Sequence, residues 1–395
     1  MKRDPAPSAD RQRGVVRVDP VRTPSDMSAF IKLPWSIYRG DSNWVPPLIM
    51  DQKTLLSRDR NPFFRHATVE YFLARRSTMP SDRSGSVVGR IAAVHDPRYI
   101  DFQRESVGFF GFYESIDDQP VADSLLSAAR GWLNERGVDT MRGPTNPGTN
   151  DSLGTLVDRF DLPPVVMMPY NPPYYPQLLE QAGLVKAKDL LAYWLSEQRM
   201  QIDRLDRVVD LLKKRHNLTL RPLDLKRIDD EIALVKEIYN DAWERNWGFV
   251  PWTDEEIEHL GHELRPVADP ELVMFAYKGD EPAGFSLSLP DLFQALIRVK
   301  SGRLFPFGLV KLLLARRSIN QVRVLAMGIR HKYRGLGLDA LFYHRTFRYA
   351  ETKGMQRGEC SWILEDNYAM RSALEKMGGE VYKTYRMYEQ STRDA

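Results

Sequence analysis

Apolar and polar residues alternate along the first half of the chain in a pattern that predicts strands followed by a helix. The runs VVGRIAAV (87–94) and SVGFFGFYE (106–114) are short, apolar and rich in β-branched and aromatic residues, as strands are. VADSLLSAARGWLNERG follows, with apolar residues at helical spacing and Gly137 at its end. This half therefore predicts two strands and an amphipathic helix in succession.

The second half shows a similar order of elements. LVMFAYKGDEPAGFSLSLP (272–290) predicts a hairpin that turns at Gly279-Asp280. VRVLAMGI (322–329) predicts an apolar strand, LDALFYHRTFRYAETKG a helix that ends at Gly354, and GECSWILE (358–365) a further strand. We interpret both halves as strand, strand, strand, helix, strand, helix, strand.

The ends of the two halves also resemble each other residue by residue. LLEQAGLVKAKDLLAYWL begins at Leu178 and ALEKMGGEVYKTYRMYEQ at Ala373. Aligning Gly183 with Gly378, 195 positions further on, pairs the following residues: Leu179 with Leu374, Glu180 with Glu375, Lys188 with Lys383, and Tyr193 with Tyr388. A fixed offset favours duplication over coincidence between two α/β domains.

This repeat predicts the domain organisation. A chain of 395 residues is too long for one ordinary core. We expect a disordered, proline-rich leader at 1–26 and two domains at 27–200 and 215–390. A charged helix should join the two domains.

Composition excludes several classes of protein. Fifty-six Lys and Arg against 53 Asp and Glu give a net charge of +3, too small to indicate nucleic-acid binding. One cysteine excludes a disulfide framework and a cysteine-based zinc site, and the histidines show no metal-binding spacing. The chain has no apolar run of about 18 residues, and its first 26 residues lack the apolar core that a signal peptide needs. We therefore expect a cytoplasmic protein without a metal.

RHKYRGLGL (330–338) is a candidate phosphate-binding turn between a strand and a helix. Gly335 and Gly337 let backbone N–H groups approach a ligand closely, and the helix N-terminus adds partial positive charge. Arg330, Lys332 and Arg334 could donate to phosphate. The alternative is a glycine-rich turn with solvated basic residues.

With its context, this turn resembles the signature of the GNAT superfamily of acyl-CoA N-acyltransferases, R/Q-x-x-G-x-G/A. Arg334, Gly337 and Asp339 occupy its positions, and WILEDNYAMRSALEKMG supplies the Asn, Asn367, that the superfamily places after its fifth strand. The resemblance covers about residues 225–389. It implies an α/β (α+β) fold of two tandem GNAT-like domains, each with a mixed, mostly antiparallel sheet flanked by helices. It further implies that acyl-CoA is held by these residues: Arg334, Gly335, Gly337, Asn367 and the backbone from Met327 to Ile329.

The first half resembles the superfamily only in its order of elements. Asp117 and Asp118 stand where phosphate donors are expected, and no glycine opens the turn. We therefore expect a degenerate domain that does not catalyse and that shapes the substrate cleft. Its loop at 142–154 is either a surface loop or a loop that faces the acceptor.

Two positions depart from the superfamily pattern. Asp339 would repel phosphate if it faced the turn, so we expect it to cap the helix or complement its dipole. Leu374 occupies the position at which superfamily members commonly carry a tyrosine acid. The proton for the leaving thiolate would then come from Tyr368, Tyr382, Tyr385 or water, and we select Tyr385.

Glu359 is the preferred candidate for the general base, and Glu365 and His331 are further candidates. Strand alternation would put Glu359, Ser361 and Ile363 on one face and Cys360, Trp362 and Leu364 on the other. A carboxylate in an apolar strand needs either a function or a partner. The alternative for Glu359 is a buried salt bridge with Arg323 or Arg357, and Cys360 is expected to pack rather than react.

LFQALIRVKSGRLFPFGLVKLLLARR (292–317) interrupts the second domain with basic and apolar residues and no acid. Such alternation suits contact with an anionic membrane or a lipid. The alternative is a pair of amphipathic helices that pack on the sibling domain. The aromatic residues of PWSIYRGDSNWVPPL (34–48) are either exposed or packed.

As a whole, the chain resembles a group of tandem-GNAT bacterial proteins that includes the bacterial ceramide synthases. YRGDSNWVPPL, MPYNPPYYP, SWILEDN and YKTYRMYE carry the resemblance. It implies transfer of a long acyl group from acyl-CoA, as a co-substrate rather than a resident cofactor, to a lipid amine such as a sphingoid base. Peripheral contact with the inner membrane would accompany it.

Three alternatives remain. One is a short-chain N-acetyltransferase acting on a small amine or a protein. Another is a non-enzymatic binding protein in which Asp339 and Leu374 mark a lost site. The third is a transfer-RNA-dependent aminoacyl transferase, which the small net charge disfavours.

Overall fold

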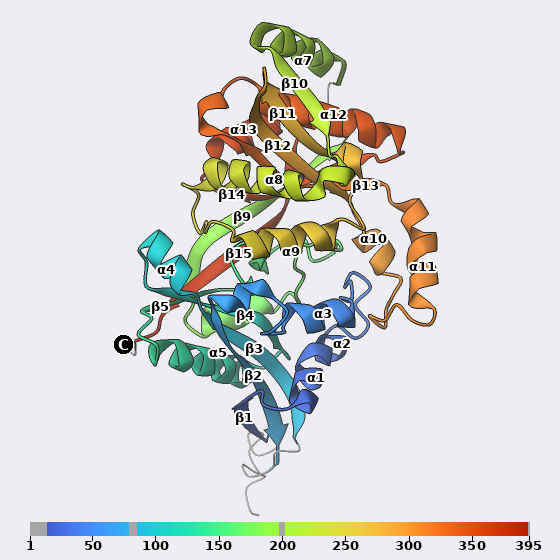
Figure 1. Ribbon diagram of the computed structural model, residues 1–395. Coiled ribbons are helices and arrows are strands. Elements are labelled where there is room, and N and C mark those ends of the chain that lie inside the picture. The colour runs from blue at the N-terminus through green and yellow to red at the C-terminus, as the bar shows by residue number, and fades with distance from the viewer. Residues whose placement is uncertain (1–13, 79–84, 197–201, 394–395) are drawn as a thin grey trace, which may run out of the picture.

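One mixed sheet of 13 strands runs through the molecule and joins its two halves (Figure 1). This computed structural model describes residues 14–78, 85–196 and 202–393. The strand order is β1-β2-β3-β4-β5-β15-β9-β14-β13-β12-β11-β10, with β8 paired to β15 beside this path. Among the strand pairs of these described residues, β4–β5 and β13–β14 are parallel and the others antiparallel. Among the described helices, none is long and apolar enough to cross a membrane.

The N-terminal half lies at the bottom of Figure 1. Its elements are β1 (Val15–Pro20), α1 (Pro24–Lys32), α2 (Pro34–Ile37), α3 (Ile49–Leu55), η2 (Pro62–Arg65), β2 (Thr68–Ser77), β3 (Ser86–His95), α4 (Pro97–Gln103), β4 (Val107–Ser115), α5 (Gln119–Asn134), β5 (Thr140–Gly143), β6 (Thr145–Asn146), β7 (Ser152–Leu153), β8 (Thr155–Leu156), α6 (Tyr175–Gln181) and β9 (Val185–Ser196). Helix α5 buries its apolar stripe on one face of this sheet, and α1 and α3 cover the other.

The C-terminal half lies at the top of the same view. Its elements are α7 (Ile202–His216), β10 (Leu218–Pro222), η3 (Leu225–Arg227), α8 (Ile228–Trp243), α9 (Asp254–Leu264), η4 (Pro270–Leu272), β11 (Val273–Lys278), β12 (Glu281–Pro290), α10 (Phe293–Leu296), α11 (Gly308–Ala315), η5 (Arg316–Ser318), β13 (Gln321–Ile329), η6 (His331–Tyr333), α12 (Leu338–Thr352), β14 (Arg357–Leu364), α13 (Tyr368–Lys376) and β15 (Glu380–Ser391). Helices α7 and α12 cover one face of its sheet and α8 the other.

The two halves exchange their last strands. Strand β9, from the N-terminal half, pairs with β14 of the C-terminal half, and β15 pairs with β5 of the N-terminal half. The exchanged strands also pair with each other, antiparallel, from Glu380 opposite Trp194 to Glu389 opposite Val185. The first residues of β9 and β15 are 195 positions apart, and so are their last residues, so the structure reproduces the repeat seen in the sequence. The strand exchange itself was not predicted.

Residues that the repeat pairs make equivalent contacts across this exchange. The Tyr193 hydroxyl, on β9, donates to Oε1 of Glu375 on α13 at 3.0 Å. The Tyr388 hydroxyl, on β15, donates to Oε1 of Glu180 on α6 at 2.9 Å. Each tyrosine therefore bonds a glutamate of the opposite half, and the two contacts are related by the same offset.

The expectation of a disordered leader through residue 26 is wrong for residues 15–26. Strand β1 pairs antiparallel with β2 over its whole length, and Thr23 caps α1 through a reciprocal bond with Asp26. The pairing satisfies backbone groups that a proline-rich composition suggested would be solvated. Residues 1–13 lie outside the described part of the chain.

The strand exchange generates a prediction about folding. Separate chains of residues 1–200 and 201–395 should each lack a cooperative thermal transition. The first chain would lack β15, which pairs with β5 and β9, and the second would lack β9, which pairs with β14 and β15, so backbone groups in each sheet would stay unpaired. Mixing or co-expressing them should restore one transition, measured by circular dichroism. Cooperative unfolding of either chain alone would show that a half can close its sheet with its own last strand.

Candidate active site

Strands β13 and β14 pair only at their beginnings and then diverge. The parallel register ends at Val324 opposite Cys360, whereas the other edge of β14 pairs with β9 from Arg357 to Leu364. The N–H of Arg330 donates to the oxygen of Ala283 on β12 at 3.0 Å. Because backbone groups alternate in direction along a strand, the N–H groups of Met327 and Ile329 point away from β12, into the gap. These are the backbone groups that the sequence analysis selected.

The glycine turn adjoins this gap and leads into α12. Gly335 and Gly337 both have φ +79°, a left-handed conformation that favours glycine. Arg334 is exposed and its Nη2 donates to the oxygen of Ala242 at 2.5 Å. Gly337 is the N-cap residue of α12, so the positive end of the helix dipole faces the turn.

Asp339 lies in the first turn of α12, whose N-cap residue is Gly337, and its side chain makes no hydrogen bond with another described residue. Of the two roles expected for it, the structure fits the dipole complement and contradicts the cap. Leu374 is fully buried in the core under α12, and its hydrocarbon side chain has no proton to donate to a thiolate.

Asn367 follows β14, at the same edge of the sheet as the glycine turn, because the carboxyl ends of neighbouring parallel strands meet there. It is the N-cap residue of α13, and its Oδ1 accepts a hydrogen bond from the N–H of Met370 at 3.2 Å. A contact between Asn367 and CoA stays a prediction.

Glu359 is completely buried on β14, on the face opposite α12. Its Oε2 lies 3.3 Å from Nε of Arg323, the neighbouring residue on β13, and both side chains are about fully enclosed. The Tyr382 hydroxyl donates to Oε1 of Glu359 at 3.4 Å. Of the two salt bridges considered for Glu359, the one with Arg323 is present.

Tyr385 is also fully buried, on β15, and its hydroxyl has no hydrogen-bond partner among the described residues. Strand β15 is separated from β14 by β9, so Tyr385 and Tyr382 reach this region through the strand exchange. The negative charge of Glu359 contributes to raising the pKa of Tyr385, after desolvation by burial, which places both groups in one electrostatic environment.

A segment of the N-terminal half, residues 162–168, covers this buried group. Asp291 Oδ1 accepts from the N–H of Val166 at 2.8 Å, while Arg323 Nη1 donates to the oxygen of Val166 at 2.5 Å. Lys383 Nζ donates to the oxygens of Leu162 and Pro163 at 2.8 and 3.0 Å. The cover is therefore fixed by three charged side chains of the C-terminal half.

Sequence reasoning did not select Lys383 or Asp291 as site residues. Lys383 is completely buried, and desolvation lowers its pKa to about 8. A lysine within the apolar strand VYKTYRMY was the available signal, since an enclosed charge needs a partner. The partners are backbone carbonyls more than two hundred residues away, which no local pattern identifies.

The predicted alternation along β14 is wrong after Cys360. Ile363 packs with Cys360 in the core under α12, whereas Trp362 and Leu364 pack on the other face with Tyr382 and Tyr385. The physical reason is a bulge: Cys360 to Ile363 on β14 spans only Tyr193 to Leu191 on β9. Cys360 is buried, as the packing role expected.

The other candidate bases occupy different surroundings. Glu365 accepts from Lys186 Nζ at 2.6 Å and from the N–H of Asp189 at 3.1 Å, which ties it to β9. The backbone N–H of His331 donates to Asp241 Oδ2 at 2.8 Å, and its ring Nε2 has no partner within the described ranges. Neither residue lies in the enclosed group around Glu359.

In the N-terminal half the equivalent gap is filled. Strands β4 and β5 pair only from Val107 to Phe109, yet a Cβ added to Gly111 would lie 1.6 Å from the oxygen of Thr145. The N–H of Phe112 donates to Oδ1 of Asn146 at 2.5 Å, so the chain itself uses this edge. Asp118 is the N-cap residue of α5, where a phosphate would have to bind.

The loop at 142–154 is mostly buried, which contradicts the surface-loop interpretation. Its first part includes Thr145, which fills the space beside Gly111. Further along, Asn150 Nδ2 donates to the oxygen of Val250 at 3.0 Å, and the Tyr239 hydroxyl donates to Asn150 Oδ1 at 3.0 Å. This loop therefore joins the two halves beside α8.

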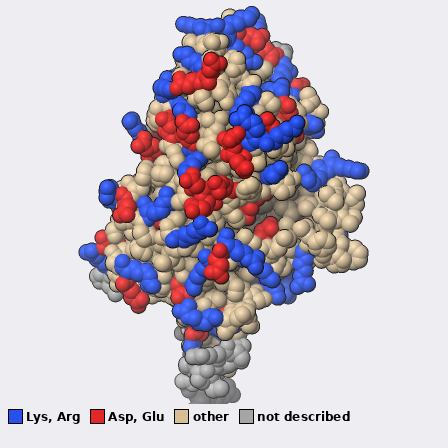
Figure 2. Space-filling view, in the orientation of Figure 1, with Lys and Arg blue, Asp and Glu red and all other residues tan. Residues whose placement is uncertain are grey.

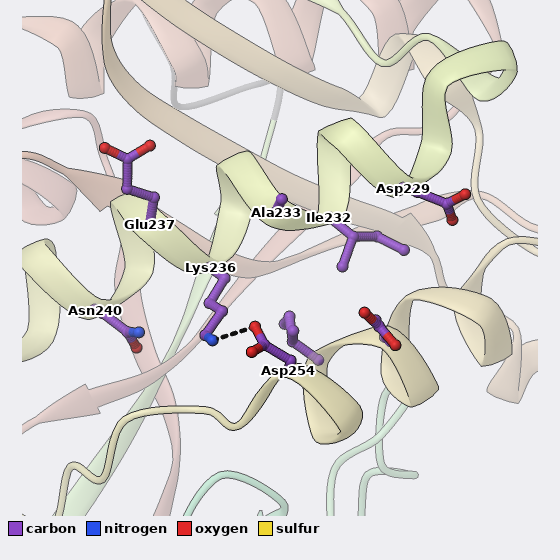
Figure 3. A pocket seen from close by; sticks show the side chains of 9 residues that line it. Asp229, Ile232, Ala233, Lys236, Glu237, Asn240 and Asp254 are labelled. Carbon is purple, nitrogen blue, oxygen red and sulfur yellow. Dashed lines mark hydrogen bonds and ion pairs between the residues drawn. The ribbon is translucent and has the colours of Figure 1, made fainter.

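An acidic groove of about 340 Å³ lies between α8 and α9 (Figure 3). Its carboxylates come from Asp229, Glu237, Asp254 and Glu258; of these, Asp254 pairs with Lys236 and Glu237 with Arg330. The acidic side chains gather over these two helices in the space-filling view (Figure 2). The groove can attract a cation.

Comparisons with known proteins identify the family. No family model matches the chain. It is 36% identical over 397 residues to the bacterial ceramide synthase of Caulobacter vibrioides, covering 97% of this chain and 99% of that protein. It is 34% identical over 373 residues to protein YghO of Escherichia coli, covering 92% and 93%.

Solved structures show the same fold at low sequence identity. A tandem GNAT protein from the clavulanic acid biosynthesis pathway has a TM-score of 0.56 at 11% identity, covering 96% of this chain and all of that chain. A GCN5-related N-acetyltransferase from Sphaerobacter thermophilus has a TM-score of 0.52 at 14% identity, covering 98% and 97%. The expected fold of two tandem GNAT-like domains is therefore confirmed. The chain belongs to the family of tandem GNAT acyltransferases that includes the bacterial ceramide synthase.

Proposed function

We propose that this acyltransferase moves a long acyl group from acyl-CoA to the primary amine of a lipid of the sphingoid type. The observation that carries the proposal is the gap between β13 and β14, with the N–H groups of Met327 and Ile329 facing it and the turn of Gly335 and Gly337 at its edge. A thioester can enter only the C-terminal gap, because Thr145 fills its N-terminal counterpart.

In the proposed reaction, Arg334 and the N-terminus of α12 hold the pyrophosphate of CoA. The amine nitrogen attacks the thioester carbonyl carbon, and the N–H groups facing the gap stabilise the oxyanion. Collapse breaks the C–S bond. The amine proton passes to Glu359, and the thiolate receives a proton from Tyr385, whose hydroxyl has no other partner among the described residues.

Because Glu359 is completely buried, the cover at 162–168 must shift before an amine can reach it. Apolar residues adjoin this cover: Val166, Leu289 and Leu292 form a buried cluster, with Phe293 and Leu325 packed against it. Such a cluster suits an acyl chain better than an acetyl group. The name of the Caulobacter relative further supports a lipid amine, and the acidic groove at α8 and α9 would attract its ammonium group.

The substrate proposal is tested by mass spectrometry of reactions of the purified protein with palmitoyl-CoA or acetyl-CoA, with and without a long-chain amino alcohol. We expect an N-acylated product only with the long thioester, because the apolar cluster would contribute binding energy to each buried methylene. Product with acetyl-CoA alone would favour the short-chain alternative. No product and no CoA binding would favour a non-enzymatic binding protein.

Arg334→Ala tests the pyrophosphate role. Loss of one charge-assisted hydrogen bond should weaken acyl-CoA binding by about 1–3 kcal/mol, measured by titration calorimetry. Arg136→Ala removes a surface arginine in the N-terminal half and should leave the affinity unchanged. Equal affinities of the parent and Arg334→Ala would exclude Arg334 from the CoA site.

Glu359→Gln tests the base through the pH dependence of turnover. Burial raises the pKa of Glu359 to about 7, opposed by the charge of Arg323. The parent should gain activity as pH rises through about 7, when the carboxylate forms, while Glu359→Gln should lose turnover at every pH and keep its CoA affinity. Glu365→Gln, directly after the end of β14, is the matched control and should show the same dependence of turnover on pH as the parent.

The same shift predicts a pH dependence of stability. A carboxyl group whose folded-state pKa is raised contributes stability that is present below about pH 4.5 and lost as pH rises through about 7. The difference in thermal midpoint between the parent and Glu359→Gln should therefore change across this window. A constant difference would show that Glu359 does not titrate there.

A further inference from the structure

Helix α11 and the turn before it expose a contiguous apolar surface, which we call the α11 face. Its members are Phe305 and Phe307, 74% and 73% exposed, with Val310, Leu313 and Leu314, 55%, 52% and 63% exposed. Side chains at positions i, i+3 and i+4 share one side of a helix, so the last three lie together. In Figure 2 the surface at the place of α11 in Figure 1 is a bulge at the right that is mostly tan, the colour of uncharged residues.

The root of this insertion is fixed to the N-terminal half, so its outer face is held in place. Trp35 Nε1 donates to the oxygen of Lys300 at 2.9 Å, and the N–H of Ile49 donates to the oxygen of Gly302 at 2.9 Å. A Cβ at Gly302 would lie 2.6 Å from the oxygen of Pro47, so close packing there requires glycine. The alternative of packing on the sibling domain is thus correct for the root but not for the α11 face.

The charges that the insertion itself carries have one sign. Arg303, Lys311, Arg316 and Arg317 are all exposed, and residues 292–317 contain no Asp or Glu. None of these four makes an ion pair with a residue in the described ranges. Exposed apolar side chains bordered by unneutralised cations are the chemistry that recognises an anionic bilayer surface.

We propose that the α11 face docks on an anionic lipid bilayer, with its phenylalanines and leucines among the acyl chains and its arginines at the headgroups. Helix α11 has 8 residues, about 12 Å at 1.5 Å per residue, so it can lie in the interface but not cross a hydrocarbon core of about 30 Å. The surrounding cations favour a bilayer over a second copy of this chain, whose α11 face would carry the same charge.

This inference goes beyond the proposed reaction, because a bilayer can be bound whichever group is transferred. It also indicates from which side a lipid substrate would reach the site. Leu292 and Phe293, at the root of the insertion, belong to the apolar cluster around Val166 that adjoins the buried Arg323. Docking would bring this cluster near the membrane from which a lipid amine would come.

The first test is co-sedimentation of the full chain with vesicles of phosphatidylcholine, with and without phosphatidylglycerol. The parent should pellet with the anionic vesicles, and the partition coefficient should fall as salt is raised. Phe305→Ser/Phe307→Ser and Arg316→Glu/Arg317→Glu should each lower it by about tenfold or more. The matched controls are Val185→Ser/Leu211→Ser, which are 61% and 69% exposed elsewhere, and Lys214→Glu/Arg215→Glu on α7; both should bind as the parent does.

The second test attaches a fluorescent probe to the α11 face and leaves the rest of the surface unchanged. Cys360 is the only cysteine and is buried, so Leu313→Cys can be labelled selectively with an environment-sensitive fluorophore. Its emission should shift to the blue with anionic vesicles. The same label at Leu211→Cys, on α7, should not respond.

Several outcomes would overturn the proposal. Parent-like binding of both double variants on the insertion, or no shift of the label at position 313, would remove the α11 face from any bilayer contact. Light scattering tests the alternative of a dimer. If the parent is a dimer that does not bind vesicles, and Phe305→Ser/Phe307→Ser makes it a monomer, the α11 face is instead an interface between two copies of the chain. Since none of these measurements uses turnover, their failure is distinguishable from failure of the proposed reaction.

Discussion

The antiparallel pairing of β9 with β15 is the interaction on which the rest of the structure depends. Each strand comes from one half of the chain and completes the sheet of the other, so backbone hydrogen bonds run without a break from β1 to β10. The reciprocal bonds of Tyr193 to Glu375 and of Tyr388 to Glu180 fix the register on both sides. A one-residue slip would turn every side chain to the wrong face, and the two halves would lose their cores together.

This exchange also makes the candidate site a product of both halves. Tyr382, Lys383 and Tyr385 arrive on β15, and residues 162–168 of the N-terminal half cover Glu359. In the N-terminal half, Thr145 lies against Gly111 beside the end of the β4–β5 pairing, while residues 162–168 of the same half cover Glu359 of the other half. Thr145, which lies against Gly111, and Val166, which binds Arg323, both belong to the segment between β5 and α6.

Enclosing Arg323, Glu359 and Lys383 carries a desolvation cost that their contacts must offset. Arg323 does so with one ion pair and the carbonyl of Val166, and Lys383 with two carbonyls. These bonds tie the cover to Arg323, which pairs with Glu359, and to Lys383, whose pKa is lowered to about 8 by burial. The same groups that hold the cover closed therefore surround the residue proposed to accept a proton.

The sequence by itself determined the elements, their repeat at an offset of 195, the glycine turn at Gly335 and Gly337, and the salt bridge of Glu359 with Arg323 as one of two options. These depend on periodicity, backbone freedom at glycine and the need of a buried charge for a partner, all of which are local. Only the tertiary structure decided which half receives β15, which backbone carbonyls bind Lys383, and how the bulge in β14 reverses the faces of Trp362 and Ile363. Pairing between distant strands leaves no periodic trace in either strand, because the same alternation fits any neighbour.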